Sequence, residues 1–224
     1  MMKIAQEKYF NFSNSQYLMI MTNSFMNIDI DIFLKKMNLD KDYLCKINQT
    51  HSDKIIFAKS PKDYGEADGL ITNTKNENIL LIQTADCIPM FIYNTEMFGL
   101  IHAGWRGIVQ KIHCNAIKEF INKGSELNKI KVFLGPSIKP CCFEIQSDIV
   151  ENFNLKYIIN KNNKMFVDLT QILIDDLINF GILRNNISYS NLCTYDSLNC
   201  VSYRRDNNSF KRMYSIMCPK KCII

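Results

Sequence analysis

Three successive segments in the middle of the chain are apolar almost throughout: ILLIQT (79–84), IPMFIY (88–93) and FGLIHA (98–103). A β-strand with one face in water alternates apolar and polar residues, whereas a strand that is covered on both faces has a nearly continuous apolar sequence. These segments lack clean alternation. We therefore expect them to form buried strands between two covering layers.

Other short β-like runs occur in the first 135 residues. They are YLMIMT (17–22), KIIFAK (54–59) and KVFLG (131–135). Each is rich in the apolar, β-branched and aromatic residues that favour strands. The first part of the chain is therefore predicted to be mainly sheet.

Two amphipathic helices are predicted from apolar residues at helical spacing. The first covers 108–120 and ends near Gly124. The second is LTQILIDDLINF, with Asp168 as N-cap, Gln171 completing a capping-box pattern and Gly181 ending the helix. Strands and helices in this order predict an α/β or α+β layered fold. No G-x-G-x-x-G follows a predicted strand, which argues against a simple Rossmann arrangement.

Composition excludes some function classes. The 224 residues contain no repeat, linker or abrupt change in composition, which predicts one domain spanning 1–224. The net charge of +5 comes from scattered lysines without a basic helix or stripe, so we expect no nucleic-acid partner. The longest apolar stretch is interrupted by Gln83, Asp86 and Pro89, so we expect no membrane span.

The cysteine content indicates a reducing compartment. Nine cysteines are an odd number, and the initial MMKIAQEKYFNF has charged and polar residues where a secretory leader is apolar. We expect reduced thiols, a cytoplasmic location and a monomer.

Three short segments each place a metal-capable or nucleophilic side chain at the end of a predicted strand. His51 lies in NQTHSD, Cys87 in QTADCIP and His102 in IHAGWRG. Two neutral imidazoles and one thiolate suit zinc, and three protein ligands leave a fourth tetrahedral position open, as in catalytic zinc sites. The alternative is a small buried thiol and two hydrogen-bonded histidines.

In their order along the chain, these segments resemble the YfiH-type family, known as laccase-domain or polyphenol-oxidase-like proteins and as purine nucleoside phosphorylases. The matching stretches are NQTHSDKI, EADGLIT, TADCIPM, IHAGWRG, LGPSIKPCCFEI and CTYDSLNCVSYRRD. The resemblance implies a layered α/β/β/α arrangement with mixed sheets. It also implies a catalytic zinc site formed by His51, Cys87 and His102, with copper as the less favoured metal.

The activity implied by this resemblance is phosphorolysis of adenosine, inosine and methylthioadenosine to the free base and sugar 1-phosphate, together with adenosine deamination. Purine nucleosides and phosphate are then the partners. The chemistry suits the ligands, because zinc lowers the pKa of a bound water to roughly 7 and can orient a phosphate oxygen toward the anomeric carbon.

The IHAGWRG segment has a predicted second role in binding an anion. Gly104 and Gly107 are expected to let the chain turn tightly from strand to helix. Arg106 and the first N–H groups of the helix suit a phosphate or another anion. The alternative is that Trp105 packs in the core and Arg106 forms a surface salt bridge.

Several polar residues are further candidates for the site. Gln49 and Gln83 are predicted to hydrogen-bond a purine edge or ribose, or else a loop backbone. Asp68 in EADGL is expected to orient a ligand histidine near the substrate, although Asp-Gly is also a turn signal. Asp86 is a weaker candidate for the same role.

The SYRRD segment offers two arginines, of which Arg204 is preferred over Arg205 as an anion contact. After this segment the chain has NNSFKR, where the family usually has a glycine, a short turn and another arginine. The loop geometry is therefore expected to differ at this point.

The remaining histidine and several cysteines are given structural roles. His113 is expected to be a solvated helix residue. Cys141 and Cys142 are adjacent, which disfavours a disulfide between them, and we expect them to pack near the LGPS turn. Cys218 and Cys222 are expected in a flexible tail.

Three other functions remain open. A cysteine hydrolase or deamidase would use Cys87 as nucleophile and His102 as base. A copper-dependent polyphenol oxidase activity would use the same trio, but a multicopper laccase needs many more histidines than the three in this chain. A zinc-stabilised interaction module would need the metal for folding rather than for catalysis.

Overall fold

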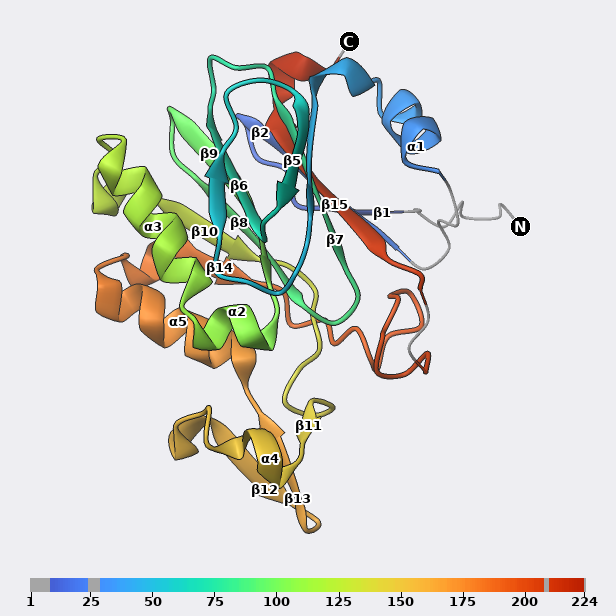
Figure 1. Cartoon of the computed structure of the whole chain (residues 1–224), viewed down its shortest axis with the longest axis vertical. Coiled ribbons are helices and arrows are strands. Elements are labelled where there is room, and N and C mark those ends of the chain that lie inside the picture. The colour runs from blue at the N-terminus through green and yellow to red at the C-terminus, as the bar shows by residue number, and fades with distance from the viewer. Residues whose placement is uncertain (1–8, 24–28, 208–209, 224) are drawn as a thin grey trace.

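The structure is a computed structural model that describes residues 9–23, 29–207 and 210–223. The sequence predicted no secretory leader in residues 1–12. Most of this segment, residues 1–8, lies outside the described residues. Two six-stranded mixed sheets form the centre of the molecule, and a three-stranded sheet extends from one end of them (Figure 1).

The order of strands across each sheet differs from their order along the chain. From edge to edge, the first sheet contains β1 (Tyr9–Asn11), β2 (Tyr17–Thr22), β15 (Met213–Pro219), β7 (Ile79–Thr84), β3 (Leu44–Asn48) and β5 (Lys62–Glu66). The second sheet contains β14 (Ile187–Tyr189), β10 (Lys131–Leu134), β8 (Ile88–Tyr93), β9 (Met97–Ala103), β6 (Gly69–Asn73) and β4 (Ile55–Phe57). The small sheet contains β11 (Glu144–Ile145), β13 (Lys164–Val167) and β12 (Ile158–Lys161).

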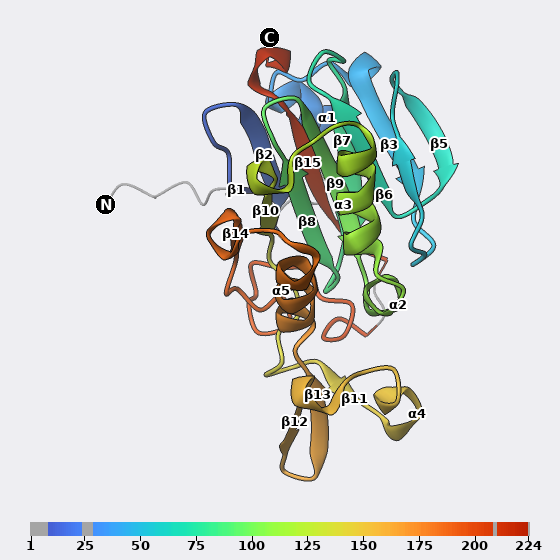
Figure 2. The ribbon, with the colours of Figure 1, turned by 90° about the vertical axis from the view of Figure 1, so that its left-hand side faces the viewer.

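Helices cover the outer faces of the two large sheets. The helices are α1 (Ile30–Lys36), α2 (Trp105–Val109), α3 (Ile112–Asn122), α4 (Ser147–Val150) and α5 (Leu169–Phe180), of which α4 lies beside the small sheet (Figure 1). Helix α1 packs on the first sheet, whereas α3 and α5 cover the second sheet and face the viewer in Figure 2. The layers are therefore helix, sheet, sheet and helix, and the predicted α/β/β/α arrangement in one domain is confirmed.

Burial on both faces explains the continuous apolar segments. In β7, Leu80 and Ile82 pack between the two sheets, whereas Ile79 and Leu81 pack against the layer of α1. In β8, Phe91 faces the first sheet, and its neighbours on either side face α3 and α5. Both faces of each strand are therefore buried in a hydrophobic core, as the lack of alternation between apolar and polar residues predicted.

The first predicted helix is interrupted. Instead of one helix over 108–120, α2 ends at Val109 and α3 begins at Ile112, because Lys111 adopts a left-handed conformation (φ 64°) that a continuous helix does not allow. Gly124, with φ 90°, follows the end of α3.

The second predicted helix is α5, and both of its ends agree with the sequence. The Asp168 carboxylate accepts a hydrogen bond from the Gln171 backbone N–H, and Gly181 ends the helix at φ 112°. The reciprocal half of the capping box is absent, because the Asp168 N–H donates to the Tyr157 carbonyl and the Gln171 side chain donates to Asp175.

The C-terminal segment is not a flexible tail. Cys218 is fully buried in β15, which pairs with both β2 and β7 inside the first sheet. Cys222 lies in a short 3₁₀ turn directly after this strand. The expectation for these two cysteines was wrong, because the last strand of the chain is a central strand.

The prediction for His113 was also wrong. Its side chain is fully buried between α3 and α5, and its Nε2 lies 2.9 Å from Asp176 Oδ2. Lys111 reaches the same carboxylate oxygen at 2.8 Å from the exposed side. Burial raises the pKa of Asp176, but hydrogen bonds from His113 and Lys111 outweigh it and lower the pKa below its usual value.

Within the described ranges, no helix has the length and apolar character needed to cross a membrane.

We expect Asp176→Ala to destabilise the fold by about 1–3 kcal/mol, because it leaves the buried His113 ring nitrogen without its partner. The control is Lys111→Met, which removes only the exposed ion pair and should cost less than about 1 kcal/mol. Urea unfolding at neutral pH measures both values. Equal losses of unfolding free energy in the two variants would show that the His113–Asp176 pair does not hold α3 to α5.

Candidate metal centre and pocket

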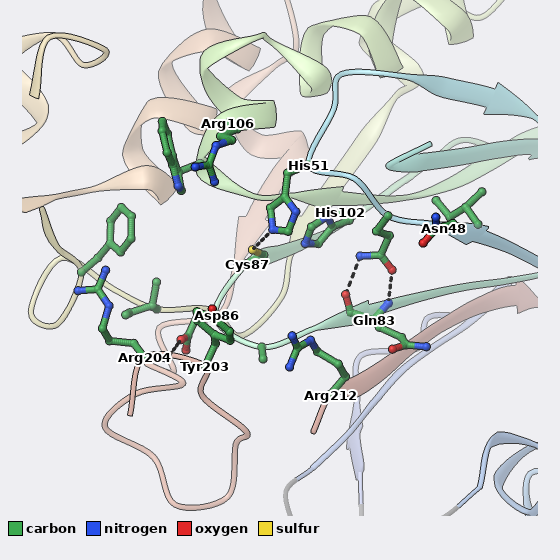
Figure 3. Close-up of a pocket in the computed structure, with 16 residues that line it drawn as sticks. Asn48, His51, Gln83, Asp86, Cys87, His102, Arg106, Tyr203, Arg204 and Arg212 are labelled. Atoms are coloured by element: carbon green, nitrogen blue, oxygen red, sulfur yellow. Dashed lines mark hydrogen bonds between the residues drawn. The ribbon is translucent and has the colours of Figure 1, made fainter. Parts of the chain in front are cut away.

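The predicted trio of metal ligands lies in one pocket at the ends of the central strands (Figure 3). His51 lies in the loop after β3, Cys87 in the turn between β7 and β8, and His102 near the end of β9. The pocket has a volume of about 560 Å³, within the range of small-molecule sites. The structure therefore brings together three segments that are far apart in the sequence.

The ligand atoms of the trio are close enough to share one ion. One atom from each of His51, Cys87 and His102 lies within 4.8 Å of the others. Cys87 Sγ is 3.9 Å from His51 Nε2, and the two imidazole rings are 4.9 Å apart and nearly perpendicular. His102 is buried, Cys87 is half-buried and His51 is exposed. The trio therefore reaches from the protein interior to the open side of the pocket.

Asp68 holds both histidines in place. Its carboxylate is fully buried and lies 2.8 Å from His102 Nδ1, which leaves Nε2 of this ring for a ligand. It also accepts backbone N–H bonds from His51 and Ser52, and a hydroxyl bond from Ser52 at 2.7 Å. Burial opposes ionisation of Asp68, but these bonds outweigh it and hold its pKa well below the usual range. Asp68 is not among the residues that line the pocket, and its bond to His102 agrees with the orienting role predicted from the sequence.

The trio itself favours a thiolate. Burial raises the pKa of the Cys87 thiol, but the charge of His102 and hydrogen bonds from both histidines lower it to about 6. Burial lowers the pKa of His102, but Cys87 and Asp68 together raise it to about 9. Both shifts favour a thiolate beside an imidazolium over a neutral thiol and imidazole, and metal binding displaces the imidazolium proton.

Gly104 is needed because the trio lies against it. A Cβ atom at this position would lie 2.8 Å from His51 Cδ2 and 3.2 Å from Cys87 Sγ. At Gly107, a Cβ atom would lie 2.9 Å from the Ser52 carbonyl oxygen. Neither glycine has a positive φ, so the predicted reason, a tight turn, was wrong. The close approach of the His51 loop is what requires these residues.

Asp86 has a different role from the predicted one. It adopts φ 83° next to Cys87, and its carboxylate accepts hydrogen bonds from Thr194 Oγ1 at 2.6 Å, Ser202 Oγ at 3.0 Å and the Arg204 backbone N–H at 2.8 Å. No histidine is among these partners. Asp86 therefore ties the Cys87 turn to the C-terminal loops instead of orienting a metal ligand.

The two glutamines form a structural pair. Gln49 Nε2 donates to the Gln83 carbonyl at 2.8 Å, and Gln49 Oε1 accepts from the Gln83 N–H at 2.7 Å (Figure 3). The side-chain amide of Gln49 therefore binds the backbone of Gln83. This agrees with the predicted alternative, a loop contact, rather than with a purine contact. The Gln83 side chain is exposed and lines the pocket.

Arg106 and Arg204 lie on one side of the trio, whereas Arg212 lies nearer to Gln83 (Figure 3). The Arg106 guanidinium stacks over the Trp105 ring at 4.4 Å, and both residues line the pocket. Trp105 is only half-buried, with its ring 6.2 Å from that of Phe153. Trp105 also packs against the hydrophobic core, as the alternative predicted, but Arg106 stacks on this ring at the pocket instead of forming the expected surface salt bridge.

The two arginines of SYRRD point to different places. Arg204 lines the pocket, lies over the Phe143 ring at 5.4 Å and donates to the Glu144 carbonyl at 2.8 Å. Arg205 instead pairs with Asp206 and donates to four carbonyl groups, those of Thr194, Tyr195, Ser197 and Cys200. The preference for Arg204 at the pocket agrees with this placement.

Sequence reasoning missed seven lining residues, which are Ile47, Asn48, Ala85, Ile138, Phe143, Tyr203 and Arg212. Phe143 and Tyr203 lie inside two of the stretches that resemble the family, LGPSIKPCCFEI and CTYDSLNCVSYRRD. Their position in these stretches is the sequence signal that could have identified them as pocket residues. Arg212 is the last residue of the unusual NNSFKR segment, of which residues 208 and 209 lie outside the described part. An arginine reaches the pocket despite the changed loop.

Comparison with known proteins identifies the family of this chain. A family model described as multi-copper polyphenol oxidoreductase laccase matches residues 26–220. A purine nucleoside phosphorylase of Clostridium acetobutylicum is 33% identical over 187 residues, which cover 78% of this chain and 76% of that protein. One from Aquifex aeolicus is 34% identical over 172 residues, covering 75% and 80%. An adenosine deaminase from an unknown prokaryotic organism is 30% identical over 179 residues, covering 71% and 68%.

Solved structures show the same fold. YlmD from Geobacillus stearothermophilus matches with a TM-score of 0.84 at 18% identity, over 97% of this chain and 98% of that one. The Bacillus licheniformis protein YfiH matches with a TM-score of 0.82 at 20% identity, over 96% and 100%. By its sequence motifs, the extent of the family match and its layered fold, this chain belongs to the multi-copper polyphenol oxidoreductase laccase family, the family of YfiH.

Proposed function

We propose that the protein is a zinc-dependent purine nucleoside phosphorylase that also deaminates adenosine, and that methylthioadenosine is among its substrates. The observation that carries the proposal is the meeting of His51, Cys87 and His102 within 4.8 Å at a pocket lined by arginines. The names of its relatives support the same reaction class.

The residues present fit a zinc ion. Two imidazoles and one thiolate are the ligand types that zinc prefers, and three protein ligands are typical of catalytic sites. Asp68 fixes the tautomer of His102 by its bond to Nδ1. Gly104 leaves the room beside the sulfur that a side chain would fill. Zinc held by this trio supplies Lewis acidity toward an oxygen of the reactants.

The arginines support an anionic co-substrate. Arg106 and Arg204 lie on the same side of the trio in Figure 3, and each is kept in place by an aromatic ring. Guanidinium groups that are held in advance bind phosphate oxygens with little loss of side-chain entropy. We assign phosphate to this side of the pocket, where these cations hold it for attack at the anomeric carbon.

The nucleoside is assigned to the other side of the trio. Gln83 and Asn48 lie there in Figure 3, opposite the two arginines, and offer amide groups. Amides both donate and accept hydrogen bonds, which suits ribose hydroxyls and a purine edge. The trio then lies between the sugar and the phosphate, where the two reactants must meet.

A cysteine hydrolase is the second candidate, because one observation favours it. The thiol of Cys87 has a pKa of about 6, and His102 beside it is oriented by Asp68, which is the order of nucleophile, base and orienting group. The ligand count does not support a multicopper oxidase. His113 is paired with Asp176 in the helical layer, so only two of the three histidines reach the pocket.

A chelator separates the zinc enzyme from the cysteine hydrolase. Removing zinc from the protein should abolish nucleoside turnover, and stoichiometric zinc should restore it. Activity that survives metal removal, and is then lost on alkylation of Cys87, would favour the hydrolase instead.

We expect His51→Ala to lose both phosphorolysis and deamination by roughly 100-fold or more, because Lewis acidity contributes several kcal/mol. The residue is exposed, so the fold should remain, as circular dichroism can check. Product analysis with adenosine and phosphate measures the two rates separately. Loss of one activity alone would mean that they do not share the site.

We expect Arg106→Met to raise the KM for phosphate by about 10- to 100-fold, since a hydrogen bond to a charged group contributes about 1.5–3 kcal/mol. The KM for adenosine in the deamination reaction should change little. The matched control is Lys75→Met, which removes one positive charge from an exposed turn outside the pocket. Equal effects of the two variants would contradict the assignment of Arg106.

A further inference from the structure

A second group of ligating side chains lies outside the trio. The sulfur atoms of Cys141, Cys142 and Cys193 are all within 4.8 Å of one another. Cys141 Sγ and Cys142 Sγ are 3.2 Å apart. Within the described ranges, the trio and this group are the two places where three or more ligating residues meet in this way. The sequence placed the adjacent cysteines near the LGPS turn but did not connect them to Cys193.

Backbone pairing brings the three cysteines together. Ser137, in the turn after β10, forms a parallel bridge with Cys193. The Thr194 N–H donates to the Ser137 carbonyl at 3.1 Å. The Cys142 N–H donates to the Lys139 carbonyl at 2.9 Å, which turns the chain back toward Cys193. The cluster is therefore held by main-chain contacts between two loops.

Hydrogen-bond donors and a lysine side chain lie around the sulfur atoms of the cluster. Cys193 is buried, and its sulfur accepts backbone N–H bonds from Lys139 and Asp196. The Lys139 ammonium also interacts with Cys193 and Cys141, and it donates to the hydroxyls of Ser137 and Thr170 at 3.1 Å each. A positive charge therefore lies beside the sulfurs.

We propose that Cys141, Cys142 and Cys193 form a second metal site that binds a divalent, thiophilic cation of the zinc class. With zinc–sulfur bonds of about 2.3 Å, tetrahedral geometry places sulfur atoms roughly 3.8 Å apart. The separations in this cluster, from 3.2 Å to within 4.8 Å, include that value. When the ion binds, the three thiols release three protons to solvent and become thiolates.

Charge selects the divalent ion. Three thiolates and a divalent cation carry one net negative charge, which the neighbouring Lys139 ammonium balances. A monovalent copper ion would leave a second negative charge without compensation in a half-buried place. Cys141 is exposed, so solvent can supply the fourth ligand.

The ion at this site would support the wall of the pocket. The loop of Cys141 and Cys142 continues into Phe143, which lines the pocket. The loop of Cys193 continues into Thr194, whose hydroxyl binds Asp86 next to Cys87. Joining the two loops fixes both contacts, so this site has a structural role and the trio has the catalytic one.

Metal stoichiometry tests the proposal. The reduced, metal-stripped protein is loaded with Zn²⁺ without oxygen, and bound zinc is measured by mass spectrometry. Cys141→Ser and Cys193→Ser should each lower the bound zinc by one equivalent per chain relative to the wild type. Cys141 is exposed, so its variant should fold even if Cys193→Ser does not. The matched control, Cys114→Ser on α3 outside both clusters, should keep the wild-type value.

The same variants in a His51→Ala background separate this site from the trio. Zinc that remains in His51→Ala should disappear when Cys141→Ser is added. With Cd²⁺ as the probe, the cadmium–thiolate absorption should fall further in the Cys141→Ser, Cys193→Ser double variant than in Cys87→Ser, because three of the four thiolates belong to this cluster.

Two results would overturn the proposal. One is unchanged zinc binding in both Cys141→Ser and Cys193→Ser, which would show that any extra zinc is adventitious. The other is a disulfide within the cluster in protein purified without oxidant, since oxidised sulfur does not ligate the ion.

Discussion

The buried carboxylate of Asp68 is the interaction on which the site depends. An ionised group without solvent contact is stable only when several donors surround it. For Asp68 the donors are the His102 ring, the backbone of the His51 loop and the hydroxyl of Ser52. The requirement to satisfy one anion therefore folds the His51 loop onto the end of β9. The positions of His51 and His102 relative to each other follow from this folding of the loop.

The layers of the fold explain why the pocket lies where it does. Strands β7, β8 and β9 are buried on both faces, so their side chains are committed to hydrophobic cores along most of their length. Polar and metal-ligating side chains are then confined to the strand ends and to the turns between the strands. Cys87 and His102 lie at such ends, and Gly104 allows the loops to meet there.

The parts of the fold that the sequence predicted are those with local causes. The strand segments at 79–84 and 88–93 agree with β7 and β8 because burial on both faces leaves a continuous apolar signal. The N-cap at Asp168 and the end at Gly181 depend on residues within the helix itself. The role of Asp68 toward a histidine followed from the chemistry of its neighbours.

The errors have long-range causes. Strand β15 was taken for a tail because its place between β2 and β7 depends on pairing with segments more than a hundred residues away. The burial of His113 depends on Asp176, 63 residues later in the chain. The amide of Gln49 is taken by the backbone of Gln83, which no local pattern reveals.

The partners of Asp86 also impose an order on biosynthesis. Its carboxylate is satisfied by Thr194, Ser202 and Arg204, which leave the ribosome roughly a hundred residues after it, some seconds later at ordinary translation speed. Until then, the turn that carries Cys87 lacks its support, even though both histidines have already been synthesised. The growing chain therefore exposes a thiol and two imidazoles without their final geometry, and we expect the metal to be acquired only after the last strand has entered the sheet.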